Sequence, residues 1–432
     1  MSRTALLDLP TEIYQTIFGH FCAHCTPGPE LTSLRKGGVS ASTRRTLAAL
    51  SQSCRSLHQV ATPLLYHEVV GDAWQLDQAL DFLRTISQRP DLAACVRHFS
   101  LGKYPTHPGQ HWLSIKKLAK SRGVLLPFKN PPHYEDPRLS GLLFDISLSL
   151  VPHVQKLGVT VFSGGDYGNY LPSSTRLSSL KELRLSLEDD YAESLQMSDF
   201  AMLFKMTPSL ENLEVGMCFS AFRGVALGNL KTLKLKNSIL KLKDLRDVAV
   251  RCTKLETFIF HTSMTEEQAP SGLEHFAPRQ IVQALTPRKG TLRHLEIQCD
   301  WEPFTSVSPK GLVTSVKELT ALETLYLDVN CLCYGSTDDF EQAHDTVAAS
   351  LMVGLLPASI KTVIIDGDRS SLYEPILKLA RHAQKGALPQ LGNFKVTGFH
   401  SSFPPFSFHK VGAAMEAAGI VFEASEKSIF LP

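Results

Sequence analysis

The sequence predicts an α/β fold in which a small N-terminal helical module is followed by a long array of strand–helix units. Two observations predict this fold. A motif of the form apolar-x-x-apolar-x-apolar recurs from about residue 96 onward, and the first seventy residues show helical spacing instead. The length of 432 residues is too great for one ordinary single-core domain and suits either several domains or one elongated array.

The composition is that of an ordinary globular protein. The 44 Lys and Arg residues nearly balance the 42 Asp and Glu residues, so no basic field exists to hold a phosphate backbone, and we expect no nucleic-acid partner. No apolar run reaches the ~18–20 residues of a membrane helix, and Asp8, Pro10 and Glu12 stand where a signal peptide needs an apolar core. We therefore expect no membrane association. Nine scattered cysteines indicate reduced thiols and a cytoplasmic or nuclear location.

The N-terminal residues predict two helices. Pro10 suits the first turn of a helix, and Ile13 and Ile17 fall on one face of it. After a stretch at 26–43 that contains Pro, Gly and Ser, a second helix is predicted from Leu47 to Ala61 because its apolar residues recur with helical spacing. We expect this second helix to end at the Pro63-Leu64-Leu65-Tyr66 segment.

The repeated motif predicts strands, and the segments between its copies predict helices. The end of each copy alternates like a strand with one buried face, whereas Leu242, Leu245 and Val248 have helical spacing. Segments 276–287, 309–319 and 341–356 follow the same helical pattern. One such unit is too small to bury its own apolar face, so neighbouring units are expected to stack. The copies begin at Val96, Val154, Leu180, Leu210, Leu230, Leu255, Leu292, Leu322, Ile360 and Leu391.

This region resembles a leucine-rich-repeat array, which implies parallel strands on the concave side and helices on the convex side of a solenoid. The position that the family fills with Asn or Cys holds Cys218 and Asn330 in two repeats and other residues elsewhere, so we expect an irregular solenoid. Several prolines predict an irregular insertion around 102–153. The alternative is an ordinary α/β domain whose buried strands look alike.

The first seventy residues resemble an F-box, the helical module that docks onto a Skp-type adaptor. Three blocks match in order: Leu-Pro-x-Glu-Ile-x-x-x-Ile-Phe at 9–18, Leu-x-x-Leu-Ser-x-x-Cys-Arg-x-Leu at 47–57, and Pro-Leu-Leu-Tyr at 63–66. The link at 22–43 is longer than usual. The whole chain resembles an F-box protein with degenerate leucine-rich repeats, a type abundant in filamentous fungi. The resemblance divides the chain into an F-box at 4–67, a helical linker at 68–95 and a leucine-rich-repeat-like solenoid at 96–432.

The resemblance implies the substrate-recognition subunit of a Skp-cullin-F-box ubiquitin ligase, which marks a bound protein for proteasomal degradation. Its partners would be the adaptor, through it the cullin and RING subunits, and an unknown protein substrate. The implied adaptor-binding residues are Leu9, Pro10, Glu12, Ile13, Ile17, Phe18, Leu50, Cys54, Leu57, Leu64 and Tyr66. The implied substrate-binding residues on the concave face are Arg184, Glu214, Lys234, Ile259, Glu296, Tyr326, Ile364 and Lys395.

Two other interpretations stay open at the level of sequence. The N-terminal residues could be a helical cap of the repeat array, since such arrays need capped ends. The chain could also be a binding scaffold that works outside any ligase. An enzyme is not predicted, because the sequence holds no G-x-S-x-G or H-E-x-x-H motif and no phosphate-binding glycine loop.

A group of cysteines and histidines has spacing that suits zinc. It comprises His20, Cys22, His24 and Cys25, with Cys54 and His58 further along the chain. Because Cys54 and His58 fall in the predicted second helix, we interpret these residues as small buried or incidental side chains. The sequence analysis therefore predicts no metal site and no cofactor.

Overall fold

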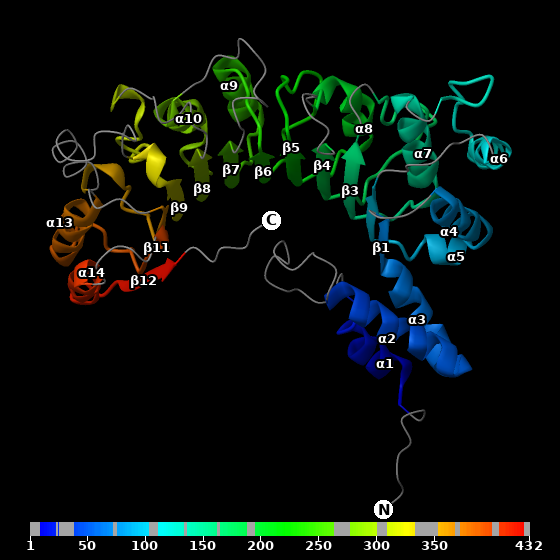
Figure 1. The fold of residues 1–432 in the computed structure, drawn as a ribbon, viewed down its shortest axis with the longest axis horizontal. Coiled ribbons are helices and arrows are strands. Elements are labelled where there is room, and N and C mark those ends of the chain that lie inside the picture. The colour runs from blue at the N-terminus through cyan, green and yellow to red at the C-terminus, as the bar shows by residue number, and fades with distance from the viewer. Residues whose placement is uncertain are drawn as a thin grey trace, which may run out of the picture. The chain divides into compact units, whose positions relative to one another are not determined.

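The computed structural model describes most of the chain, in two compact units (Figure 1). One unit comprises residues 1–188 and 199–210, and the other comprises residues 189–198 and 211–432. We call them unit 1 and unit 2. The residues whose structure is described are 9–22, 25, 39–71, 76–102, 111–133, 136–161, 165–187, 195–262, 277–299, 309–332, 353–367, 372–399 and 406–426.

The strands are parallel and follow one another in chain order, from β1 to β12, with helices between them. Each of the ten copies of the motif leads into a strand, which confirms the predicted strands. This order is consistent with a leucine-rich-repeat-like array. The motif did not predict the first and last strands of this series, β1 and β12. Unit 1 contains β1 (Glu68–Gly71), β2 (His98–Leu101), β3 (Lys156–Val161) and β4 (Glu182–Leu187). Unit 2 contains β5 (Asn212–Gly216), β6 (Thr232–Lys236), β7 (Thr257–Thr262), β8 (His294–Cys299), β9 (Thr324–Asp328), β10 (Thr362–Asp366), β11 (Asn393–Phe399) and β12 (Val421–Glu426).

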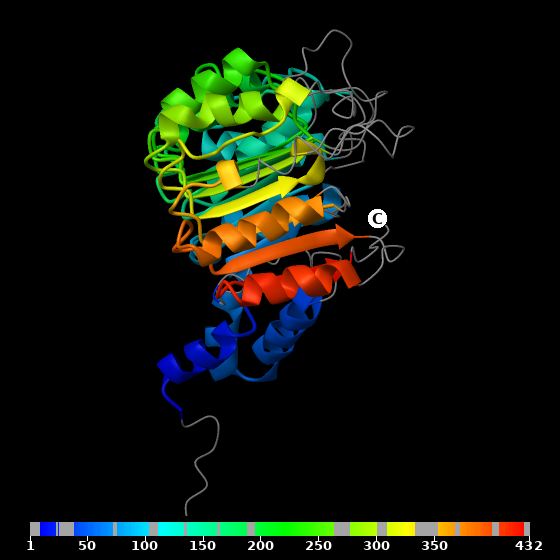
Figure 2. The same ribbon diagram turned by 90° about the vertical axis from the view of Figure 1, so that its left-hand side faces the viewer.

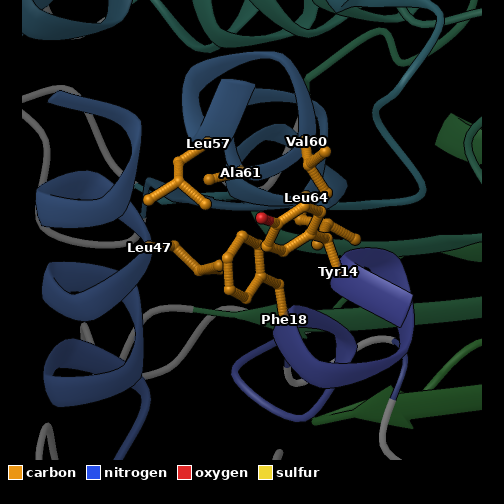
Figure 3. Packing of buried hydrophobic residues seen from close by; sticks show 7 residues of the cluster. All are labelled: Tyr14, Phe18, Leu47, Leu57, Val60, Ala61 and Leu64. Carbon is orange, nitrogen blue, oxygen red and sulfur yellow. The ribbon is translucent and has the colours of Figure 1, made fainter. Parts of the chain in front are cut away.

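Unit 1 begins with a helical module formed by α1 (Thr11–Gly19), α2 (Val39–Ser53) and α3 (Arg55–His67). Its core gathers side chains from all three helices (Figure 3). Apolar residues of α1 and α3 recur every three or four positions, so each helix buries one stripe. The core residues are Tyr14, Phe18, Leu47, Leu57, Val60, Ala61 and Leu64.

The single helix predicted from Leu47 onward is wrong, because the structure contains two helices there. Cys54 has extended backbone angles, φ −158° and ψ 168°, and stands at the N-terminal cap of α3. The helix end expected at the Pro63-Leu64-Leu65-Tyr66 segment is close to the observed one, since α3 contains Pro63 and ends at His67. Proline there removes one helical hydrogen bond, but Val60 and Leu64 are buried on either side of it, and their packing offsets this loss.

Most of the remaining helices of unit 1 occupy the linker and insertion segments of the sequence, and α8 (Ala201–Met206) lies between β4 and β5. The segment at 68–95 contains strand β1 as well as helices, and the segment around 102–153 contains two helices. One of these buries ten of its 14 residues, and its sequence accordingly lacks a continuous polar face. The helices are α4 (Leu76–Gln88), α5 (Pro90–Ala93), α6 (Trp112–Arg122), the buried α7 (Pro137–Leu150) and α8 (Ala201–Met206), which the 3₁₀ turn η3 (Met197–Phe200) precedes.

Unit 2 carries its helices between its strands. Figure 1 shows α9 (Leu242–Arg251) and α10 (Pro278–Leu285) on the same side of β6, β7 and β8. Figure 2 shows α13 (Tyr373–Gln384, orange) and α14 (Phe406–Glu416, red) running side by side, in agreement with their contacts. Short 3₁₀ turns are η5 (Thr286–Arg288), η6 (Pro309–Gly311) and η7 (Val329–Cys331).

The helix predicted at 309–319 is wrong. The structure forms only the short turn η6 at its start. The Val313 N–H then donates to the Cys331 carbonyl at 2.8 Å, and the Val316 N–H donates to the Leu355 carbonyl at 2.8 Å. These bonds to other segments satisfy backbone groups that a helix would have paired internally. The helix predicted at 341–356 lies mostly outside the described residues.

One repeat position has left-handed backbone in four copies of the motif. It is the second residue after the last apolar residue of the motif, and its φ is +55° at Met217, +48° at Asn237, +103° at Gly367 and +80° at Gly398. Glycine and asparagine tolerate this conformation best. The shared geometry indicates that the repeats turn out of their strands in the same way.

Among the helices of the described residues, none has both the length and the apolar composition needed to cross a membrane.

Candidate functional site

Helix α1 leaves part of its apolar surface uncovered. Ile13 and Ile17 lie one turn apart on α1 and are 44% and 40% exposed. Their sequence neighbours Tyr14 and Phe18 are each only 4% exposed, because they point into the core of the module. The helix therefore packs on one face and presents two isoleucines on another.

The structure divides the predicted adaptor-binding residues into two groups. The exposed group lies on α1 and at its N-terminal end, and consists of Pro10, Glu12, Ile13 and Ile17. Phe18, Leu57 and Leu64 belong to the buried core instead. Leu9, Leu50 and Cys54 are partly buried against that core. Tyr66 is also partly buried, and its ring stacks on Phe82 with a centroid separation of 6.4 Å.

A cavity of about 590 Å³ lies beside α1 and α3. Tyr14 of the first helix and Leu9, just before that helix, line it on one side, and Val60 and Pro63 line it from the third helix. Cys25 and His67 lie on its wall as well. The cavity wall therefore includes a cysteine and a histidine, two residue types that can bind a metal ion.

A second candidate surface is a row of side chains across the strands of unit 2. In β5, β6, β8 and β10 the partly buried positions alternate with fully buried ones, so they share one face of the sheet. In β7 the residue at this position, Ile259, is itself buried. The strand register aligns seven of the eight predicted substrate-binding residues as neighbours. In order they are Glu214, Lys234, Ile259, Glu296, Tyr326, Ile364 and Lys395. The eighth, Arg184, is partly buried on β4 of unit 1.

Two histidines hold the Glu296 carboxylate on this face. His261 Nε2 donates to Oε1 at 2.7 Å, and His294 Nε2 lies 3.5 Å from Oε2. Burial alone would raise the pKa of Glu296, but the hydrogen bonds from the two histidines outweigh it and lower this pKa to about 2. Glu296 is therefore an ionised, well-anchored acceptor.

A second polar group lies toward the C-terminal ends of the same strands. Gln298 Nε2 donates to the Tyr326 hydroxyl at 2.7 Å and lies 3.4 Å from Asp366 Oδ2. Thr397 donates to Asp366 Oδ1 at 2.6 Å. Burial and the nearby Asp366 raise the pKa of Tyr326, so its hydroxyl stays protonated. These bonds hold the Tyr326 hydroxyl in place, and the strand register sets Tyr326 beside Ile364.

The structure regroups the cysteines and histidines whose spacing suits zinc. Cys22 and Cys25 come together with His67, and their potential ligand atoms all lie within 4.8 Å of one another. His58 lies elsewhere on α3, with Nδ1 2.8 Å from the Ser51 carbonyl oxygen. His24 is outside the described residues. Sequence reasoning missed His67 because it follows Cys25 by 42 residues.

In comparisons with known proteins, no family model matches the chain, and no curated protein matches it either.

Proposed function

We propose that this chain is the substrate-recognition subunit of a Skp-cullin-F-box ubiquitin ligase. In this proposal the exposed face of α1 binds the Skp-type adaptor, and the row of side chains on the sheet of unit 2 binds a protein target. The observation that carries the proposal is the pair Ile13 and Ile17, exposed on a helix whose opposite face is packed. The order of the three sequence blocks supports the choice of adaptor.

The exposed pair has the chemistry of a helix that docks into an apolar groove. Residues one turn apart on a helix enter the same groove together. Burial of one isoleucine side chain contributes about 1.5–3 kcal/mol before the costs of association are subtracted. Two such side chains, with Pro10 beside them, give a small but specific contact.

The row on unit 2 suits a protein target because it combines apolar anchors with charges of both signs. Tyr326 and Ile364 supply apolar contact area, and Tyr326 adds a hydroxyl, whereas Ile259 is only 9% exposed and contributes little. Along the row, Lys234 lies before these residues and Lys395 lies after them, and Glu296 lies between Ile259 and Tyr326. Such a surface binds and positions a target, and the ligase would act by proximity, which raises the effective concentration of a target lysine.

Co-purification with a Skp-type adaptor tests the proposal. The full-length chain is compared with an Ile13→Asp/Ile17→Asp variant, and Gln52→Asp on the exposed side of α2 is the matched control. We expect the wild type and the control to retain the adaptor, and the double variant to lose it. Circular dichroism of all three chains checks that they remain folded.

Two results would overturn the proposal. Equal capture by all three chains would show that the α1 face is not the adaptor surface. Failure of the folded wild type to bind any Skp-type adaptor would favour a scaffold that works outside the ligase.

A further inference from the structure

The segment after α1 forms a turn that carries two cysteines. The Cys22 N–H donates to the Gly19 carbonyl at 3.0 Å, and the Cys25 N–H donates to the Cys22 carbonyl at 3.0 Å. The second bond closes a turn of four residues, with a cysteine at each end. A C-x₂-C turn is the arrangement by which many proteins present two sulfurs to one metal ion.

His67 brings a nitrogen ligand to the same place from the end of α3. Its Nδ1 lies 3.3 Å from Cys25 Sγ and 3.8 Å from Cys22 Sγ. Its own backbone carbonyl accepts a hydrogen bond from the Arg97 N–H at 3.0 Å, which ties this residue to the start of the sheet. The backbone of His67 is thus anchored independently of the turn that carries the cysteines.

These separations match a tetrahedral zinc site. With Zn–S bonds of about 2.3 Å and Zn–N bonds of about 2.0–2.1 Å, tetrahedral angles place sulfur and nitrogen ligands roughly 3.6 Å apart. The two observed separations, 3.3 and 3.8 Å, lie on either side of that value. Both sulfur–nitrogen separations therefore suit one ion, and the three ligand atoms all lie within 4.8 Å of one another.

We propose that Cys22, Cys25 and His67 bind one Zn²⁺ ion, with a water molecule as the fourth ligand. Two thiolates and an imidazole form the mixed sulfur and nitrogen set that zinc prefers. Each thiol releases one proton when the ion binds, so no oxidant or reductant is needed. Cys22 is buried and Cys25 is exposed, so the ion can enter from the solvent side through Cys25.

The ion would act as a structural clamp. It would connect the turn after α1 with the last residue of α3, immediately before β1 begins. It would also close the cavity wall to which Cys25 and His67 contribute. Binding to the folded state alone stabilises that state, so zinc should raise the unfolding temperature of the chain. This role does not depend on the proposed ligase function.

Zinc content and cobalt spectroscopy test the site on the full-length chain without a histidine tag. The chain is loaded with Zn²⁺ and dialysed, and zinc is measured by elemental analysis. In a parallel experiment Co²⁺ is titrated into metal-free chain, and sulfur-to-cobalt charge-transfer absorption is recorded. Cys25→Ser and His67→Ala remove a ligand, while Cys54→Ser and His58→Ala are matched controls from the same module.

We expect about one zinc ion per chain in the wild type and in both controls, and at least about a tenfold weaker affinity in the two ligand variants. Zinc should raise the unfolding temperature of the wild type and controls only. Melting of the metal-free chains shows whether each variant still folds. Wild type without stoichiometric zinc, or a Cys25→Ser variant that binds zinc as tightly as the wild type, would overturn the proposal.

Discussion

The buried carboxylate of Asp145 accepts a hydrogen bond from the backbone N–H of Tyr170 at 2.8 Å. The other carboxylate oxygen accepts from the Gly168 N–H, also at 2.8 Å. Asp145 lies in the mostly buried helix α7, whereas its partners lie in the segment after β3. One acidic side chain therefore satisfies two backbone donors that would otherwise be buried without acceptors.

The first prediction concerns this bond pair. Asp145→Ala leaves both donors without their acceptors, and we expect it to lower the free energy of unfolding by on the order of 3 kcal/mol. Asp145→Asn keeps one acceptor oxygen and should cost less. Urea denaturation followed by circular dichroism measures both changes. An alanine variant as stable as the wild type would show that other groups or water replace the carboxylate.

The second prediction separates folding from binding on α1. Phe18→Ala removes a core side chain that is 4% exposed, and should cost about 3–5 kcal/mol of stability. Ile17→Ala removes a side chain that is 40% exposed, and should change stability by about 0.5 kcal/mol or less. Thermal unfolding measures both. If Ile17→Ala destabilised as much as Phe18→Ala, Ile17 would belong to the core and not to a binding face.

The strands of the repeats were predictable from sequence because alternation of apolar residues reports directly on a strand with one buried face. Leu233 and Leu235 of β6 are buried, and Lys234 between them is not. The first and last strands of the array were harder to predict. Strand β1 follows α3 without a turn, and its short Glu-Val-Val-Gly sequence lacks the leading part of the motif. Strand β12 lacks it as well, so periodicity alone could not identify either.

The candidate sites were only partly predictable. The F-box-like motif identifies Ile17 and Phe18 together, and both are apolar, so residue type cannot show which one faces the core. Only packing against α2 and α3 separates them. His67 could not be found from spacing, because its partnership with Cys22 and Cys25 depends on how α3 returns toward the end of α1.

The third prediction uses the repeat position with positive φ. The left-handed backbone of Met217 costs about 1 kcal/mol, because its Cβ atom crowds the following carbonyl oxygen. Glycine has no Cβ atom, so Met217→Gly should raise the free energy of unfolding by up to that amount. Met217 is partly buried, and loss of that burial would reduce this gain. Urea denaturation decides the sign. A clearly destabilised Met217→Gly variant would show that its side chain matters more than its backbone.

The same repeat position predicts the opposite effect at Gly367. A Cβ atom there would lie 2.5 Å from Val329 Cγ1, and the φ of +103° is unfavourable for any L side chain. Gly367→Ala should therefore destabilise unit 2 by roughly 1–3 kcal/mol. Gly228→Ala is the matched control, because a Cβ atom at Gly228 meets nothing within 4 Å. Equal stability of the two variants would contradict the strain at Gly367.

The final prediction concerns the stability of the chain at acidic pH. The pKa of Glu296 is held at about 2 in the folded chain, below its ordinary value of 4.5, so folding favours the ionised form. The stabilisation from this group is complete above about pH 4.5 and is lost as the pH falls through about 2.

We therefore expect the wild type to lose unfolding free energy faster than Glu296→Gln between about pH 5 and 2, since glutamine cannot bind that proton. Urea denaturation at several pH values in this interval gives the two curves. Glu256→Gln, at an exposed glutamate that precedes β7, is the control and should follow the wild type. Parallel curves for the wild type and Glu296→Gln would mean that the two histidines do not stabilise the carboxylate. Glu296 would then not be a fixed negative charge on the proposed target-binding face.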